Sequence, residues 1–510
     1  MIIKKRSVVA IVVCFLISIL IVGGSGQAQA AKELRVGVGN LPPSFDPQAE
    51  VSLTASRVLY NVFDTLIVMD PDDNSILSPG LALSWDRLSD TVMELKLRPN
   101  VVWHNGDPFT SADVKFSFER ALYTQGKFSL ARSLLSVITN IETPDPLTVL
   151  ITTEHPDPVL EYRLASLWGS WIVPEKYITE NGDEHFARNP IGTGPFKVTS
   201  YAPNQVVMER FPEYWGTLAN VDVVRYMEIP EASARVTALV NNEVEIIEPV
   251  PADLVPMLER YDHIRVVSNE HQLIHLLVYN TQNPLFQNKK FRQALNLGID
   301  RDLIVEALWP QGASSTRGHQ FPDYGPMYLS DRPYTEYNPE KARKLVQESG
   351  YKGETIYYDL IPGYYDSDVE AAEIIIEMWK DIGVNAEIRF TSKFWQYEDF
   401  GVHPWSYAMR FPDPVGGLWL LWGQYGSRQS NGQWVNVPPR FNELGHQLSY
   451  VLDLEERINI FTEMLDIFED EAPGTTLWRP AITWGINNKV EWTPSNTHTM
   501  DFGGNSLNMK

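Results

Sequence analysis

Two histidines have the residue type and the spacing that metal sites use. His271 and His275 are four residues apart, and neutral imidazole is a common zinc ligand. The apolar residues around them predict a strand, and no third ligand follows nearby. We therefore expect two ordinary strand histidines here and no metal site.

Three polar side chains, at Asp70, Asp72 and Asn74, imitate the start of a calcium-binding loop. Such a loop needs Gly at its sixth position and Glu at its twelfth. Ser75 and Leu81 occupy those positions instead, so a solvated acidic turn is the better interpretation. We predict no metal ligand and no cofactor.

The familiar catalytic and nucleotide-binding motifs are missing. Gly37-Val38-Gly39 follows a predicted strand, but the third Gly of a dinucleotide-binding turn is absent and Pro42-Pro43 follows. No Gly-x-Ser-x-Gly elbow, His-Glu-x-x-His motif or phosphate-cradling loop occurs. Paired carboxylates are so numerous in this acidic chain that their presence does not indicate a catalytic site. We therefore predict no catalytic residue and no enzyme, and an exported hydrolase remains the alternative from another class.

Composition narrows the class further. The 510 residues include 42 Lys and Arg against 65 Asp and Glu, a formal net charge of −23 with no basic block to offset it. That sign opposes binding to a phosphate backbone, so no nucleic-acid partner is expected. A hydrophobic content of 44% and a single Cys exclude disordered and disulfide-stapled chains. The chain is long enough for roughly three domains.

The first residues have the order of a secretory signal peptide. Lys4–Arg6 precede the apolar run Val8–Val22, and Ala28-Gln29-Ala30 has the small-x-small pattern of a cleavage site. The run is too short for a hydrocarbon core of about 30 Å, although an uncleaved anchor stays an alternative. Cys14 lies inside the run, so lipid attachment is not expected. We predict a cleaved Sec-type signal peptide at 1–30 and a soluble periplasmic protein.

The elements that must position any site alternate between strands and helices. Leu34–Val38 and Met93–Leu97 alternate apolar and polar or Gly residues as strands do. Pro339–Ser349 has a helix's capping residues at both ends. Asp368–Ile382 predicts a helix that leads directly into the alternating segment Val384–Phe390. This succession predicts an α/β fold.

Several motifs, in this order, resemble the extracytoplasmic solute-binding proteins of family 5, the peptide, nickel and opine group that serves ATP-binding-cassette (ABC) importers. The stretch LRPNVVWHNGDPFTSADVKFSFERAL is the most specific of them. The motifs are LYNVFDTL (59–66), LSPGLA (77–82), the long stretch at 97–122, PIGTGPFKV (190–198), FRQALNLGIDRDLI (291–304) and YNPEKARKLVQESGY (337–351).

These motifs have mainly structural explanations. Asn105-Gly106-Asp107 predicts a tight turn, and Thr110 or Ser111 can cap the helix that follows. Gly192 and Gly194 predict constrained backbone beside a strand. We therefore interpret them as scaffold rather than as ligand contacts.

The resemblance implies a two-lobed, periplasmic-binding-protein-like architecture of type II with an extra inserted domain. Lobe I is expected at 32–62, 189–279 and 475–510, the inserted domain at 63–188, and lobe II at 280–474. A ligand would bind in the cleft between the lobes.

Ligand contacts are expected at three strand-to-loop junctions, Asn40–Ser44, Lys393–Trp395 and Tyr407–Pro414. Clustered Trp residues add flat apolar faces that suit sugar rings or side chains, although core packing explains each Trp singly. The predicted ligand-binding residues are Asn40, Trp395, Tyr407, Met409, Arg410, Asp413 and Trp419.

The segment from Tyr407 to Pro414 carries the most information about the ligand. In the peptide-binding members that it resembles, this segment reads Asp-x-x-acidic-Pro, and the first Asp pairs with the amino terminus of the peptide. Here Arg410 replaces that Asp, and a guanidinium suits a carboxylate or phosphate rather than an ammonium. Two alternatives stay open: Arg410 faces the cleft, or it forms an internal ion pair with Asp413.

The function that follows is ligand capture for transport. The resemblance implies a monomeric solute-binding component that closes on a small ligand and delivers it to the permease and ATPase of an ABC importer. Peptides are the commonest ligands of the family. An acidic opine, an acylated peptide or a glycoside is the alternative that Arg410 and the Trp residues favour.

Overall fold

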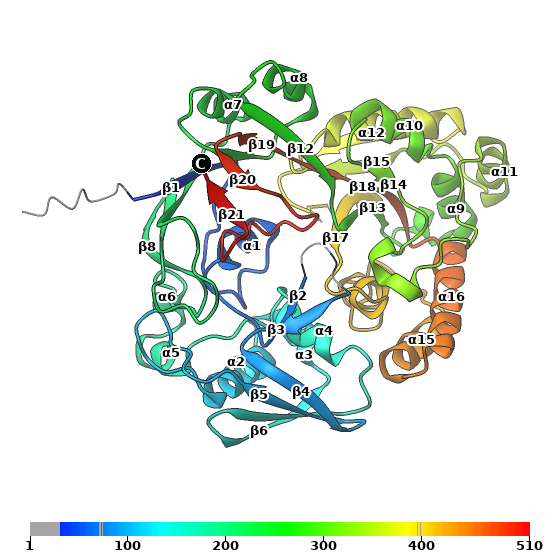
Figure 1. The fold of residues 1–510 in the computed structure, drawn as a ribbon. Coiled ribbons are helices and arrows are strands. Elements are labelled where there is room, and N and C mark those ends of the chain that lie inside the picture. The colour runs from blue at the N-terminus through cyan, green and yellow to red at the C-terminus, as the bar shows by residue number, and fades with distance from the viewer. Residues whose placement is uncertain (1–30, 71–72, 74, 395, 398) are drawn as a thin grey trace, which may run out of the picture. The chain divides into compact units, whose positions relative to one another are not determined.

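The computed structural model describes residues 31–510 except 71, 72, 74, 395 and 398; the predicted signal peptide lies outside the described residues. From Lys32 onward the chain forms one compact unit built on three larger sheets (Figure 1). The first has seven strands. In spatial order they are β12 (Ile264–Glu270), β19 (Ala481–Asn487), β11 (Ile246–Glu248), β1 (Glu33–Val38), β10 (Val223–Glu228), β9 (Gln205–Arg210) and β8 (Phe196–Ala202).

The second sheet has six strands and the third has four. The six-stranded order is β14 (Ser314–Ser315), β18 (Gly474–Arg479), β13 (Leu273–Tyr279), β17 (Val402–Ala408), β15 (Ile356–Leu360) and β16 (Ala386–Phe390). The four-stranded order is β4 (Ala82–Ser89), β5 (Val92–Leu97), β7 (Thr148–Thr153) and β6 (Ile138–Asp145). Two short pairs complete the sheets: β2 (Ile67–Met69) with β3 (Leu77–Pro79), and β20 (Val490–Trp492) with β21 (Leu507–Met509).

Helices pack around these sheets, and most of the longer ones follow β13. The earlier helices are α1 (Leu53–Leu59), α2 (Ser111–Tyr123), α3 (Ser129–Leu135), α4 (Leu160–Ala165), α5 (Glu175–Asn181), α6 (Asp183–Phe186), α7 (Ala232–Val240) and α8 (Val255–Leu258). The later ones are α9 (Lys289–Leu297), α10 (Arg301–Leu308), α11 (Pro339–Ser349), α12 (Asp368–Asp381), α13 (Leu420–Trp422), α14 (Ser427–Ser430), α15 (Pro439–Tyr450) and α16 (Leu454–Glu471).

Local capping explains why α11 has its predicted bounds and why α10 begins at Arg301. At α11 the side chain of Asn338 accepts a hydrogen bond from the backbone N–H of Lys341 at 2.9 Å, and Gly350 ends the helix at a φ of 74°. At α10 the Asp300 carboxylate accepts from the N–H of Leu303 at 3.1 Å. These bonds satisfy N–H groups that a helix leaves open at its start. The strands predicted at 34–38 and 93–97 are β1 and β5, and β16 begins two residues later than predicted.

The chain passes between the seven- and six-stranded sheets at two adjacent points. β12 leads through His271 and Gln272 into β13, and β18 leads through Pro480 into β19. The N–H of His271 donates to the carbonyl of Pro480 at 2.8 Å, which ties the two crossings together. Arg479 forms ion pairs with Glu270 at 2.7 Å and with Asp323 at 3.2 Å. The two sheets are therefore joined by a short, hydrogen-bonded double connection.

The Gly-Thr-Gly motif holds the start and the end of the segment that carries the four-stranded sheet. The N–H of Gly194 donates to the carbonyl of Val62 at 2.9 Å. His104 accepts from the N–H of Gly192 at 3.1 Å through Nδ1, and its Nε2 lies 3.0 Å from the carbonyl of Gly194. A Cβ on Gly192 would lie 1.8 Å from the Val62 oxygen. The motif is scaffold, as predicted, because only Gly leaves room for this approach.

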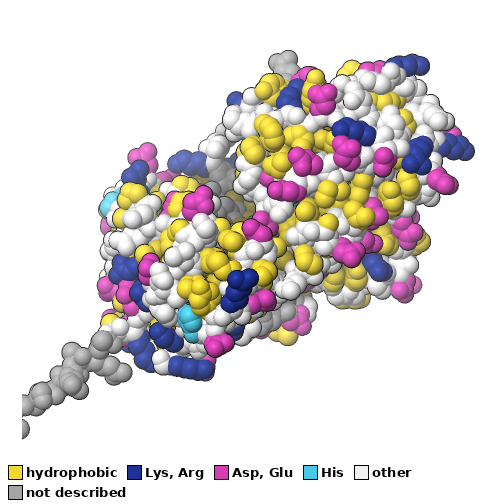
Figure 2. Space-filling view, turned by 90° about the horizontal axis from the view of Figure 1, so that it is seen from above, with side chains coloured by type: hydrophobic (Ala, Val, Ile, Leu, Met, Phe, Trp, Pro, Cys, Tyr) yellow, Lys and Arg dark blue, Asp and Glu magenta, His cyan; other side chains and the backbone are white. Residues whose placement is uncertain are grey.

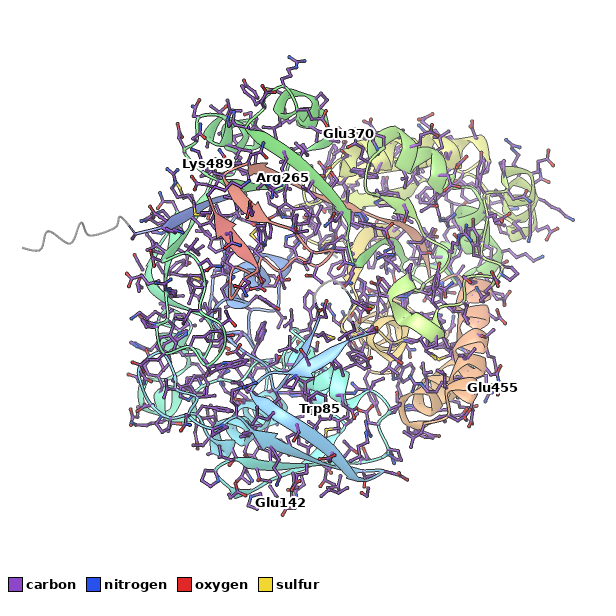
Figure 3. All side chains as sticks on the ribbon, in the orientation of Figure 1. Trp85, Glu142, Arg265, Glu370, Glu455 and Lys489 are labelled. Atoms are coloured by element: carbon purple, nitrogen blue, oxygen red, sulfur yellow. The ribbon has the colours of Figure 1, made fainter. Side chains whose placement is uncertain are left out.

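The acidic side chains lie largely on the outside. Figure 2 shows Lys and Arg side chains scattered among Asp and Glu on the face it presents. Glu142 on β6 and Glu455 on α16 lie at the periphery in Figure 3, and both are exposed. Among the described residues, none of the helices combines the length and the apolar character that crossing a bilayer requires.

Replacing Gly192 tests the close approach to Val62. We expect Gly192→Ala to lower the free energy of unfolding by about 3 kcal/mol or more, because the added Cβ overlaps a backbone oxygen that cannot rotate away. Gly39→Ala is the matched control, since its Cβ would meet nothing nearer than Arg235 Nη1 at 3.4 Å. Urea unfolding at pH 7 measures both variants, and equal stability of the two would contradict the interpretation.

Candidate functional site

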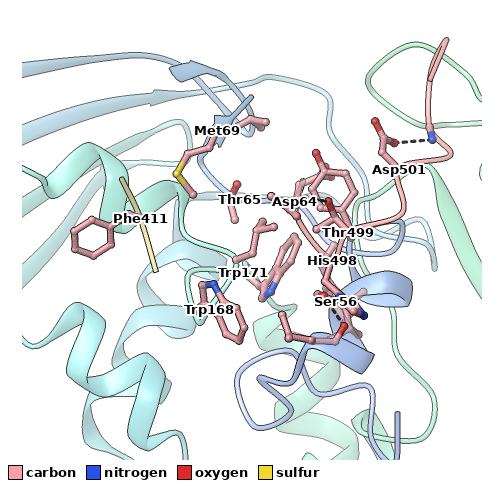
Figure 4. A pocket seen from close by; sticks show the side chains of 18 of the residues that line it. Ser56, Asp64, Thr65, Met69, Trp168, Trp171, Phe411, His498, Thr499 and Asp501 are labelled. Carbon is pink, nitrogen blue, oxygen red and sulfur yellow. Dashed lines mark hydrogen bonds between the residues drawn. The ribbon is translucent and has the colours of Figure 1, made fainter. Parts of the chain in front are cut away.

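A cavity of about 360 Å³ is lined by segments from all parts of the fold (Figure 4). Ser56 and Tyr60 come from α1 and its end, and Trp168 comes from the loop after α4. Met409 to Phe411 follow β17, and Thr497 to Ser506 belong to the loop between β20 and β21. His271 and Gln272, at the crossing between the two large sheets, also line it.

Aromatic rings form much of the cavity wall. Tyr60 and Trp171 meet edge to face with ring centroids 6.4 Å apart. Tyr214 and Trp215 lie 5.1 Å apart on another part of the lining. Trp168 stands beside Trp171 in Figure 4. Such a wall buries flat apolar groups at a small entropic cost.

Arg410 is the cation of this wall. Its Cζ lies 3.9 Å from the ring centroid of Trp168 and 4.9 Å from that of Tyr407. No ion pair joins it to a carboxylate among the described residues, and its Nε and Nη1 atoms are buried without a hydrogen-bond partner. Burial lowers the pKa of Arg410 below its ordinary value, while Tyr407 opposes that shift.

Asp413 does not pair with Arg410. Its carboxylate accepts from Arg457 Nη2 at 2.5 Å and from the N–H of Val415 at 2.8 Å. The side chain of Asp413 is buried by this arrangement. Of the two alternatives left open by the sequence, the internal Arg410–Asp413 pair is therefore wrong, and Arg410 lines the cavity.

The other predicted contact residues take different places. Met409 lines the cavity, whereas Tyr407 lies behind Arg410 and donates to the carbonyl of Gly416 at 3.1 Å. Asn40 accepts from Arg57 at 2.9 Å and Trp419 packs in the core, both away from the lining. Trp395 lies outside the described residues, so its predicted role and that of the others stay predictions.

A buried charge network supports one side of the cavity. Arg57 Nη1 donates to Glu248 at 2.6 Å, and His498 Nε2 lies 3.3 Å from the other oxygen of the same carboxylate. His498 Nδ1 in turn lies 3.3 Å from Nε2 of His271. Burial favours the neutral form of Glu248, yet Arg57 and His498 outweigh it and hold its pKa far below its usual range. Burial, with the neighbouring His498, lowers the pKa of His271 well below its ordinary value.

Asp64 is an acidic residue of the cavity lining whose pKa is shifted by its surroundings. Its Oδ2 accepts from Thr193 at 2.7 Å and from the Trp215 indole at 3.0 Å. Burial raises the pKa of Asp64 to about 6, although these two hydrogen bonds and Arg98 oppose the shift. Asp501 also lines the cavity, but its carboxylate is occupied by the N–H of Gly503 at 2.8 Å and by the Ser506 hydroxyl at 2.6 Å.

The sequence did not reveal most of this lining. The sequence predicts flat apolar faces from clustered Trp residues but no role for Trp168 in particular, and it predicts none for Asp64, Trp215 or His498. Asp64 belongs to the LYNVFDTL motif and Trp215 follows PIGTGPFKV, so proximity to family motifs was the available signal. Within the described part of the chain, no three His, Cys, Asp or Glu residues are arranged to hold a metal ion. The site can enclose and orient a small molecule.

The fold is a two-lobed α/β architecture with an aromatic-lined cavity. A family model described as bacterial extracellular solute-binding proteins, family 5 Middle, matches residues 77–429. The chain belongs to this family.

Individual relatives agree with that membership. A putative ABC transporter peptide-binding protein of Brucella ovis is 29% identical over 330 residues, a match that spans 62% of this chain and 59% of the relative's length. The dipeptide-binding protein of Escherichia coli K12 is 27% identical over 88% of this chain and 90% of its own. The structure of the periplasmic binding protein DppA from Helicobacter pylori in complex with the peptide STSA has a TM-score of 0.82, at 23% identity, over 94% of this chain and 98% of that one.

Removing Arg57 tests the buried network. We expect Arg57→Met to lower the free energy of unfolding by about 3–5 kcal/mol, because it leaves Glu248 charged and buried without its main partner. The double variant Arg57→Met/Glu248→Gln should recover more than half of that loss. Urea unfolding at pH 7 measures both.

The exposed pair Arg440–Glu463, with side chains 47% and 46% exposed, supplies the matched control. Arg440→Met should change the free energy of unfolding by less than about 1 kcal/mol. A loss in Arg57→Met no larger than this control would contradict the role given to the network.

The raised pKa of Asp64 predicts a pH-dependent effect on stability. The folded state binds a proton at Asp64 more tightly than the unfolded state between its ordinary pKa of about 4 and about 6. The contribution of Asp64 to stability therefore falls as pH rises through that window. Relative to the wild type, Asp64→Asn should gain at most about 3 kcal/mol between pH 4 and pH 7. Thermal unfolding at both pH values measures the gain, and a constant difference would refute it.

Proposed function

We propose that the protein is the solute-binding component of an ABC import system. It captures one small ligand in the cavity and presents it to a membrane permease and ATPase. The observation that carries the proposal is an aromatic-lined cavity whose lining comes from α1, from the end of β17 and the segment after it, and from the crossing between the two large sheets at His271 and Gln272. Family membership supports the same role, and the names of the relatives make a peptide-type ligand the first candidate.

The proposed mechanism is conformational and makes or breaks no covalent bond. A ligand that touches α1 on one side and the segment after β17 on the other binds the closed arrangement better than an open one. That difference in affinity shifts the population towards closure. The double connection at His271 and Pro480 is short enough to act as the hinge.

The domain division follows from this mechanism. The segment with the four-stranded sheet is the inserted domain, and the seven- and six-stranded sheets are the cores of lobes I and II. Because β13 and β18 pair within the six-stranded sheet, we place the boundaries of lobe II at the two crossings, near 272 and 480. This division gives lobe II a few residues that the sequence-based boundaries gave to lobe I.

The cellular setting also belongs to the proposal. An extracellular family and the tripartite order of the first thirty residues support export through a cleaved signal peptide into a periplasm. We propose that the protein acts there as a monomer.

Recovery of a bound ligand tests the function. Native mass spectrometry of the purified protein should show one small molecule bound per chain, and extraction after unfolding should release that molecule chemically intact. Returned to stripped protein, the molecule should saturate at one site in a calorimetric titration. Turnover of the added molecule into products would instead identify a hydrolase, and protein that binds neither recovered nor added solutes would refute the proposal.

A further inference from the structure

Most buried arginines of this fold have their charge or their N–H groups satisfied by protein. Arg57, Arg163 and Arg457 each form an ion pair with a buried carboxylate at 2.5–2.7 Å. Arg292 and Arg301 donate to backbone carbonyls. Arg410 has no carboxylate or carbonyl partner among the described residues, and the polar group that stabilises its charge there is the neutral Tyr407 hydroxyl. Such a cation inside a protein is unfavourable unless something else supplies the negative charge.

The position of the guanidinium is fixed although it has no anionic acceptor among the described residues. It lies against the faces of Trp168 and Tyr407, at the distances given above, and rings of this kind attract cations. The backbone is held as well: the carbonyl of Arg410 accepts from the Ser166 hydroxyl at 2.8 Å, and its N–H donates to Gly416 at 3.2 Å. An immobile cation is pre-organised for a partner that arrives from outside.

One edge of the guanidinium remains open to that partner. Nε and Nη1 are buried without a hydrogen-bond partner, whereas Nη2 is not among the buried unpartnered atoms. Arg410 keeps part of its surface accessible and lines the cavity. Nη2 is therefore the donor that a molecule in the cavity would meet.

We propose that Arg410 determines specificity by binding a terminal oxyanion of the ligand, a carboxylate or a phosphate, through Nη2. This inference rests on the proposed ligand-binding function. Trp168 and Trp171 would cover a flat apolar part of the same molecule. The charge at this position excludes an ammonium anchor, because a guanidinium only donates hydrogen bonds.

The rest of the lining limits the ligand to one anionic end. Asp64 and Asp501 also line the cavity, and Figure 4 shows Asp501 across the view from Phe411, the neighbour of Arg410. A second anionic group at the acidic side would meet like charge. The ligand class is thus a molecule with one terminal oxyanion, an apolar or aromatic body, and a neutral or cationic far end.

Four small aromatic probes test this anchor: indole-3-acetate, its neutral amide indole-3-acetamide, the amine tryptamine, and phenyl phosphate. Each is titrated by calorimetry into protein stripped of ligand by unfolding and refolding. The wild type should bind indole-3-acetate at least tenfold more tightly than the amide, and tryptamine least. Phenyl phosphate is compared with indole-3-acetate to tell a preference for phosphate from a preference for carboxylate. The anion that binds more tightly identifies the group that the site prefers.

Variants connect the preference to Arg410. Arg410→Gln should bind acid and amide within about threefold of each other. Arg410→Lys should retain part of the preference for the acid, because it keeps the charge and loses the planar contact. Arg440→Gln, at an exposed arginine outside the cavity, should behave as the wild type. Unchanged far-UV circular dichroism and melting temperature show that each variant is folded.

The outcomes separate this inference from the function on which it rests. Equal affinity of the wild type for acid and amide, tighter binding of tryptamine, or an unchanged preference in Arg410→Gln would overturn the oxyanion anchor. So would a protein that binds none of the probes but holds a recovered solute without an anionic group, and ligand capture would then stand alone. Protein that binds neither probe nor recovered solute would overturn both.

Discussion

The double connection between the two large sheets is the constraint on which the rest of the site depends. The chain passes between the sheets at His271–Gln272 and again at Pro480, and a backbone hydrogen bond joins the two crossings. Arg479 anchors the same region to Glu270 and Asp323. His271 and Gln272 also line the cavity. A change in the angle between the sheets would therefore change the shape of the cavity and its contacts with a bound molecule.

The cavity uses two kinds of charge in different ways. Glu248, Arg57 and His498 satisfy one another and stabilise the wall behind the cavity. Arg410 is held by aromatic faces and keeps a donor open. The first arrangement satisfies the charge within the protein and leaves little for a ligand to gain, whereas the second leaves an interaction for the ligand to complete. Under the proposed oxyanion anchor, this contrast distinguishes a structural ion network from a recognition element within one pocket.

Sequence reasoning reached the fold more fully than the site. The cap at the start of α11 and the alternation in β1 and β5 are local signals, so a helix and two strands could be placed from them. The cavity depends on side chains more than 400 residues apart, such as Ser56 and His498, which no local pattern brings together. Arg410 could be singled out because its charge is opposite to that in the resembling proteins. The sequence could not show that Arg410 and Asp413 are unpaired, because the residue that binds Asp413 is Arg457, on the distant helix α16.

The contact between Val62 and Gly194 has a consequence for how such a protein can change. The chain leaves one core at Val62 and returns beside the same residue some 130 positions later, so the intervening segment is a loop closed at its base. A segment of this kind can be exchanged or remodelled without changing the strand order of either neighbouring sheet. Since Trp168 and Trp171 reach the cavity from that segment, substitutions within it change one wall of the pocket, which gives the architecture a direct route to new ligands.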